Sequence, residues 1–218
     1  MVNLLDLLDG LAQRIAPPRH RPDQQPYSGR TLRPQRTGGG NVADVIDLIL
    51  KDHTWFREQF AELDRLRAVE QPDLDAIGAV WSALATKLDL HADAEEEIFY
   101  PQLLRLGEED PQEETLDAIG DHNDIRDGVA AAAQKKVGSD AWWDAVHQAR
   151  EANDEHMGEE EHEGLADMRL HAPAALIEEL GRAWTIYFAQ HDGTTTDGVD
   201  TSDKDPEQYV AEHSTDRR

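Results

Sequence analysis

Apolar residues return every three or four positions along most of this 218-residue chain, a spacing typical of helices that bury one face. The pattern predicts four long helices at residues 41–71, 73–106, 112–137 and 141–170, and a shorter helix at 173–190. No stretch alternates like a strand. Because the connections are short, we expect an all-α fold in which four helices form an antiparallel up-and-down bundle, followed by the short fifth helix.

The ends of these helices are marked by residues that start or stop helical structure. Asn41 follows three glycines and is expected to cap the first helix. Pro72 ends that helix because proline disfavours helical geometry in the residue before it. Pro101 is expected to kink the second helix, and Gly107 to close it.

The chain outside the bundle differs in composition. Residues 2–16 can form a short amphipathic helix, which we expect to pack on the bundle, on a partner protein or on a second copy. Residues 17–40 are rich in proline, glycine and arginine, as linkers are. We therefore predict three parts: this extension to residue 40, the bundle with its fifth helix at 41–190, and a disordered acidic tail at 191–218.

Charge and cysteine content exclude several classes of function. The net charge of −25 argues against nucleic acid or an anionic membrane surface as a partner. The chain has no cysteine, which excludes disulfides, thiolate metal sites and a cysteine nucleophile. No apolar run reaches the roughly 20 residues that span a bilayer, and the N-terminal stretch lacks the basic region of a signal peptide. We therefore expect a cytoplasmic protein.

A short pattern of histidine and glutamate occurs twice on the apolar faces. Each copy has an Asp-His pair on one helix and a His-x-x-x-Glu-Glu motif on the next. The first copy is Asp52-His53 with His91-x-x-x-Glu95-Glu96, and the second is Asp121-His122 with His156-x-x-x-Glu160-Glu161. A spacing of four residues puts the histidine and the glutamate of each motif on one helix face, about 6 Å apart along the axis.

These positions predict a metal centre inside the bundle. Buried polar groups without partners would cost several kcal/mol each, and counting residues from the turns puts all six in one layer of the bundle. The six candidate ligands are His53, His91, Glu95, His122, His156 and Glu160. Four imidazoles and two carboxylates suit a pair of iron ions, with manganese as the alternative. A closed tetrahedral zinc site would use fewer ligands.

Other polar residues near these positions leave their roles open. Glu96 and Glu161 either bind or support the metal, or belong to a solvated helix face. Arg57 and Arg126 are expected to pair with the many carboxylates. Tyr100 is explained equally well as a wall of the site and as ordinary packing.

The arrangement resembles the hemerythrin-like HHE cation-binding family over about residues 41–170. The resemblance implies a four-helix bundle around a non-haem di-iron centre. Members bind dioxygen, sense oxygen or iron, or handle peroxide and nitric oxide. It also implies that Glu95 and Glu160 bridge two irons while the four histidines are terminal ligands.

The chain departs from the oxygen-carrying members of that family in two places. They have a second histidine one turn after the third-helix histidine, where this chain has Arg126. They also close the fourth-helix motif with an aspartate five residues after the histidine, whereas here Glu160 follows at four and Glu161 at five. One fewer imidazole predicts an open coordination position, which argues against reversible dioxygen carriage and favours peroxide chemistry.

The sequence leaves three functions to distinguish. The first is a catalase-like centre that decomposes peroxide. The second is a binding module for dioxygen, nitric oxide or iron that senses without turnover and signals through the N-terminal extension. The third is a bundle without metal that stabilises a partner through residues 2–16 and the fifth helix.

Overall fold

The computed structural model describes residues 44–191 and 193–214, all within a compact unit that spans residues 39–218. These two ranges contain helices and connections but no strand, which confirms the predicted all-α class. The predicted helix at 2–16, the linker and the cap at Asn41 lie outside the described residues.

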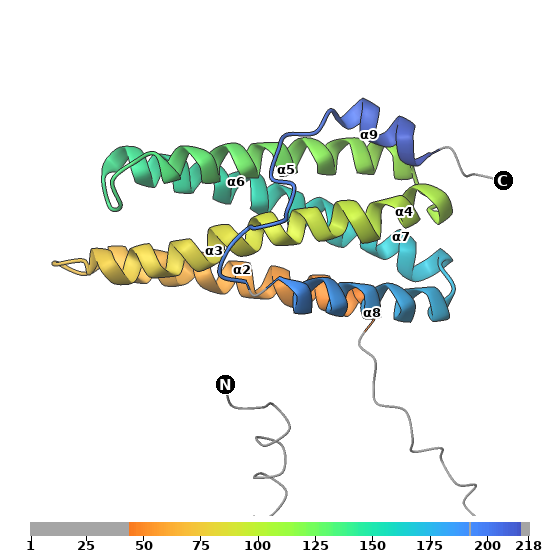
Figure 1. Ribbon diagram of the computed structural model, residues 1–218, viewed down its shortest axis with the longest axis horizontal. Coiled ribbons are helices and arrows are strands. Elements are labelled where there is room, and N and C mark those ends of the chain that lie inside the picture. The colour runs from red at the N-terminus through yellow and green to blue at the C-terminus, as the bar shows by residue number, and fades with distance from the viewer. Residues whose placement is uncertain (1–43, 192, 215–218) are drawn as a thin grey trace, which may run out of the picture. The chain divides into compact units, whose positions relative to one another are not determined.

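Two helical hairpins make up most of the structure (Figure 1). Helix α2 (Val45–Arg67) packs against α3 (Leu74–Ala94), and α5 (Pro111–Ala133) packs against α6 (Asp140–His162). The α5–α6 crossing is close, because a Cβ atom added to Gly128 would lie 2.6 Å from the backbone nitrogen of Ala149. The first helix starts after Asp44, whose side chain accepts from the Asp47 N–H at 2.7 Å.

The second predicted helix is interrupted by a π-helical turn. After α3 comes the π-helix η1 (Glu95–Phe99), followed by α4 (Tyr100–Leu106). The N–H of Tyr100 accordingly bonds to the carbonyl of Glu95, five residues back. Pro101 lies in the first turn of α4, where its lack of an N–H is tolerated. Such π turns are often found at functional sites.

The fourth predicted helix is also in two pieces, so the prediction of one helix over 141–170 is wrong at Glu163. Its backbone (φ −113°, ψ −85°) separates α6 from α7 (Gly164–His171). The break brings Gly164 close to α4 and α5, where an added Cβ would lie 3.0 Å from the Glu114 carboxylate and 3.2 Å from Leu103. The predicted fifth helix is confirmed as α8 (Ala174–Gln190), which packs on α2 and α3.

The prediction of a disordered tail is wrong for the part that the structure describes. Residues 206–213 form helix α9 (Pro206–His213), which packs on α5 and α4 (Figure 1). Asp205 caps this helix by accepting from the Gln208 N–H at 3.0 Å. Tyr209 and Val210 are buried against the core. Two adjacent apolar side chains therefore anchor a segment whose overall composition is that of a tail.

Two apolar clusters form the core, and the candidate ligands lie between them. On α2, Ile49 belongs to the first cluster and Phe56 to the second, with His53 between the two. The same order holds on α5 around His122. The fold thus encloses a polar layer with hydrocarbon on both sides, which excludes bulk water from it.

Candidate metal centre

The predicted ligands meet in the interior, at the polar layer between the two apolar clusters. Four of them, His53, Glu95, His156 and Glu160, offer ligand atoms that all lie within 4.8 Å of one another. They come from α2, η1 and α6. None of these four residues is more than 2 % exposed.

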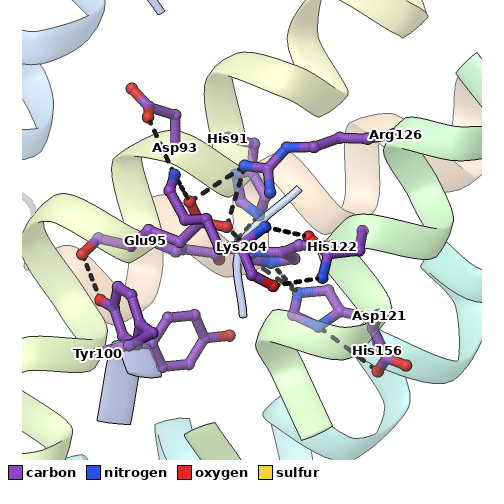
Figure 2. Close-up of polar contacts among 12 residues, drawn as sticks. His91, Asp93, Glu95, Tyr100, Asp121, His122, Arg126, His156 and Lys204 are labelled. Carbon is purple, nitrogen blue, oxygen red and sulfur yellow. Dashed lines mark hydrogen bonds and ion pairs between the residues drawn. The ribbon is translucent and has the colours of Figure 1, made fainter. Parts of the chain in front are cut away.

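The other two predicted ligands adjoin this group through Glu95. His91 Nε2 lies 2.9 Å from Glu95 Oε1, and His122 Nε2 lies 3.3 Å from Glu95 Oε2 (Figure 2). His122 Nε2 is also 3.3 Å from the Nε2 atom of His156. Glu95 therefore stands at the centre, with imidazoles from α3, α5 and α6 directed at its two oxygens.

The second glutamate of each His-x-x-x-Glu-Glu motif contacts a histidine on the side away from the inner glutamates. Glu161 Oε1 lies 3.0 Å from His53 Nδ1, and Glu96 Oε1 lies 2.8 Å from His122 Nδ1. The two contacts correspond in the duplicated pattern. They give Glu96 and Glu161, whose roles the sequence left open, the same supporting position.

The aspartates of the two Asp-His pairs take the corresponding position at the other two histidines. Asp52 Oδ2 lies 3.5 Å from His91 Nδ1, and Asp121 Oδ2 lies 3.9 Å from His156 Nδ1. All four imidazoles thus turn Nδ1 toward an outer carboxylate and Nε2 toward the inner glutamates. A carboxylate at Nδ1 fixes the orientation of the ring and leaves Nε2 to bind a metal.

Cations neutralise three of the four outer carboxylates. Arg57 Nη1 lies 2.8 Å from Glu161 and Arg126 Nη2 lies 3.0 Å from Glu96, which confirms the predicted pairing of both arginines. Lys87 Nζ lies 2.6 Å from Asp52. The described residues place no lysine or arginine against the fourth, Asp121.

The surroundings of the outer carboxylates shift their pKa values in opposite directions. Burial acts to raise the pKa of Glu96. Contacts with His122, Arg126 and Lys204 outweigh it and lower this pKa to about 2. At Asp121, burial and the neighbouring Glu159 raise the pKa to about 7. The outer carboxylates therefore differ in how readily they give up their proton.

The inner groups of the centre keep Glu95 ionised, because histidines surround its carboxylate. Burial acts to raise the pKa of Glu95, but His91 and His122 hold it well below its usual value. Burial likewise acts to lower the pKa of His91, but Glu95 and Asp52 raise it to about 10. Burial and the charge of His122 lower the pKa of His156. In the metal-free protein, a proton on His91 thus neutralises the Glu95 carboxylate, as a bound metal ion would.

Unpartnered atoms test whether this set of residues fits a metal ion. Within the described ranges, several buried ligand-type atoms of the cluster have no hydrogen-bonding partner: His53 Nε2, His91 Nε2, both carboxylate oxygens of Glu95, and Glu160 Oε2. Buried polar atoms are nearly always satisfied, so each of these calls for a partner. Imidazole nitrogen and carboxylate oxygen are ligands that iron, manganese and zinc accept. The residues present therefore fit a metal centre.

Two residues contact the centre in ways that the sequence did not predict: Tyr100, whose role the sequence left open, and Lys204. The Tyr100 hydroxyl donates to Glu160 Oε1 at 3.0 Å, and this tyrosine is fully buried. Its position five residues after Glu95 is the only signal in the sequence, and packing explained it as well. Lys204 pairs with Glu96 from the tail, where no pattern pointed to a contact.

The structure defines an all-helical protein with a buried histidine and glutamate cluster that could hold a metal ion. A model of the family described as the hemerythrin HHE cation binding domain matches residues 44–166. The chain belongs to this family, whose domains typically bind metal ions. Comparison with curated proteins and with solved structures gave no match. No helix in the described ranges is both long and apolar enough to cross a membrane.

Proposed function

We propose that this chain is a non-haem di-iron protein that reacts with a small oxidant, with peroxide as the favoured substrate and dioxygen or nitric oxide as alternatives. The metal ligands in this proposal are His53, His91, Glu95, His122, His156 and Glu160. The ligands come from α2, α3 and the adjoining η1, α5 and α6, which we take to form the antiparallel bundle expected of the family.

The common orientation of the four imidazoles is the observation that carries this proposal. Each has Nδ1 toward an outer carboxylate and Nε2 toward Glu95 or Glu160. Ordinary core histidines need only one partner, and nothing requires four of them to face inward by the same nitrogen. Metal-binding histidines typically donate an outer hydrogen bond of this kind. His53 and His122 make it here, while the carboxylates facing His91 and His156 lie at 3.5 and 3.9 Å.

The number of donors supports two ions and a hard or borderline metal. Six inner ligands exceed what one tetrahedral ion uses. Mixed imidazole and carboxylate sets suit iron or manganese. Arg126, one turn after His122, pairs with Glu96 and offers no metal-binding atom to the centre. This supports a coordination position left open for an oxidant.

Bound iron would supply the redox chemistry, and the chain would supply orientation and a dry site. Tyr100 holds Glu160 by donating its hydroxyl proton to Oε1. Burial and the nearby Glu160 and Glu95 raise the pKa of Tyr100, so its hydroxyl keeps its proton and holds Glu160 in place. The apolar clusters on both sides keep bulk water away from the reacting groups.

Metal analysis with a turnover assay tests the proposal. We expect two iron ions per chain, a higher melting temperature than the chelator-treated protein, and oxygen evolution from hydrogen peroxide above that of free iron. His53→Ala should lose iron, whereas His147→Ala, at an exposed histidine that contacts Arg67, should not. A reversible visible band with dioxygen and no turnover would favour a sensing module instead. Identical melting of treated and untreated protein, with no iron in either, would refute a metal centre.

A further inference from the structure

The C-terminal segment lies across the bundle beside the metal centre. Residues 199–213, which we call the C-terminal strap, end in α9, which lies along α5 and also packs on α4 (Figure 1). They lie beyond the stretch that matches the family, which ends at residue 166. The strap is therefore a feature of this chain that the family match does not describe.

Three contacts fix the strap to the bundle. The Asn123 side chain donates to the Lys204 carbonyl at 2.8 Å and accepts from the Lys204 N–H at 2.9 Å. The Tyr209 hydroxyl donates to the backbone carbonyl of Glu96. Tyr209 and Val210 are buried in the core cluster. These contacts hold the backbone at Lys204 in one place relative to η1.

The side chain of Lys204 reaches an outer carboxylate of the centre. Its ammonium group forms an ion pair with Glu96 Oε2, with Asp93 Oδ1 at 3.8 Å (Figure 2). The other oxygen of Glu96 lies 2.8 Å from His122 Nδ1. Lys204 is thus connected to His122 through one carboxylate, and His122 Nε2 faces the inner group Glu95.

The other half of the centre has no such arrangement. Glu161, the equivalent of Glu96, pairs with Arg57, whose side chain is 46 % exposed. Glu96 is 3 % exposed and pairs with two cations, Arg126 and Lys204. Screening by solvent weakens the exposed pair far more than the buried ones.

We propose that Lys204 is a positioning residue, and that the C-terminal strap uses it to hold Glu96 against His122 and so to set the affinity of one of the two metal positions. Arg126 alone leaves Glu96 free to turn, since the guanidinium lies about equally close to both oxygens, 3.0 and 3.1 Å from Oε1 and Oε2. Lys204 holds Oε2 and thereby directs Oε1 to the imidazole. The proposal rests on the di-iron function proposed above.

Titration of the metal-free protein with ferrous iron under anaerobic conditions tests the role of Lys204. Loss of a supporting contact at a ligand typically weakens metal binding about 10–100-fold. We expect Lys204→Met to weaken one of two iron equivalents about 10-fold and to leave the other unchanged. Lys204→Arg should restore most of the affinity. Lys135→Met, which removes the same charge at an exposed position, should match the unaltered protein.

A double-mutant cycle separates positioning from general stability. If Lys204 acts through Glu96, Lys204→Met should have no further effect on iron affinity in a Glu96→Gln background. A purely structural lysine would weaken both equivalents together and lower the melting temperature in both backgrounds. Either additive effects or equal loss at both equivalents would overturn the proposal.

Imidazole nitrogen resonances in the metal-free protein give a readout that needs no metal. We expect the hydrogen-bonded Nδ1 signal of His122 to shift in Lys204→Met and that of His53 to stay. If the unaltered chain binds no iron, the proposed function fails, and this measurement still decides whether Lys204 positions His122. An unchanged His122 signal would overturn the proposal.

Discussion

Replacing Glu95 by glutamine removes the charge at the centre of the cluster while keeping the size of the side chain. Glu95 is fully buried, and it lies 2.9 Å from His91 Nε2 and 3.3 Å from His122 Nε2. The imidazoles around it then lose the carboxylate that stabilises their protonated forms. We expect Glu95→Gln to abolish binding of both metal equivalents, because this carboxylate faces both halves of the duplicated pattern.

The effect on the metal-free protein follows from the burial of the pair. Breaking a buried ion pair by removing one partner costs about 3–5 kcal/mol. His91 and His122 can each release a proton to avoid a stranded charge, so we expect the lower end of that range, about 3 kcal/mol in the free energy of unfolding at pH 7. Glu97→Gln, two residues later on an exposed position of η1, is the matched control and should change stability by less than about 0.5 kcal/mol.

The pH dependence of unfolding gives the sharpest check. The pKa of His91 rises from its usual 6.5 to about 10 in the folded metal-free chain. A raised pKa in the folded state adds stability that is complete below pH 6.5 and is lost as pH rises through about 10. Glu95→Gln should remove this loss, so the two proteins should converge in urea melts as the pH approaches 10. Parallel curves across this range would refute the assigned role of Glu95.

Three further substitutions test the helix packing and the support of the centre. Gly128→Ala should destabilise the protein by about 1–3 kcal/mol, because the new Cβ would meet the backbone of Ala149 at 2.6 Å. Gly120→Ala, on the same helix with nothing within 4 Å of an added Cβ, should instead stabilise by about 0.5–1 kcal/mol in the same urea melts. Tyr100→Phe leaves Oε1 of Glu160 without its donor and should weaken iron binding about 10-fold. Unchanged iron titration would show that the hydroxyl does not orient Glu160.

The helices were largely predictable because their apolar faces repeat at helical spacing. Their interruptions were not, since each depends on contacts between distant parts of the chain. Pro101 predicted a kink in the second helix, but not the π turn at Glu95–Phe99 that precedes it. The break at Glu163 precedes a glycine that approaches Glu114 on another helix. Sequence spacing reports which face of a helix is buried, but not where a neighbouring helix forces the backbone to adjust.

The inner residues of the candidate site were predictable for a different reason from the outer ones. Polar residues such as His53 stand out on an apolar face, and their repeated order made chance occurrence hard to accept. Outer groups such as Glu96 occur in runs of charge that usually belong to solvated faces, so the sequence left their roles open. Lys204 contacts Glu96 across 108 positions of the chain, and no local pattern carries such a pairing. Disorder was predicted for the tail from its polar composition, which gave no weight to the two residues, Tyr209 and Val210, that anchor α9 in the core.

The duplicated pattern supplies equivalent inner donors to surroundings that differ. On one side, Glu96 lies buried between two cations and holds His122. On the other, Glu161 holds His53 with an arginine that is nearly half exposed. Because salt screens an exposed pair more than a buried one, the contact at His53 should weaken with ionic strength while the contact at His122 persists. If the proposed di-iron centre is present, we therefore expect its two metal positions to differ in affinity, with the more buried outer charges at the stronger one.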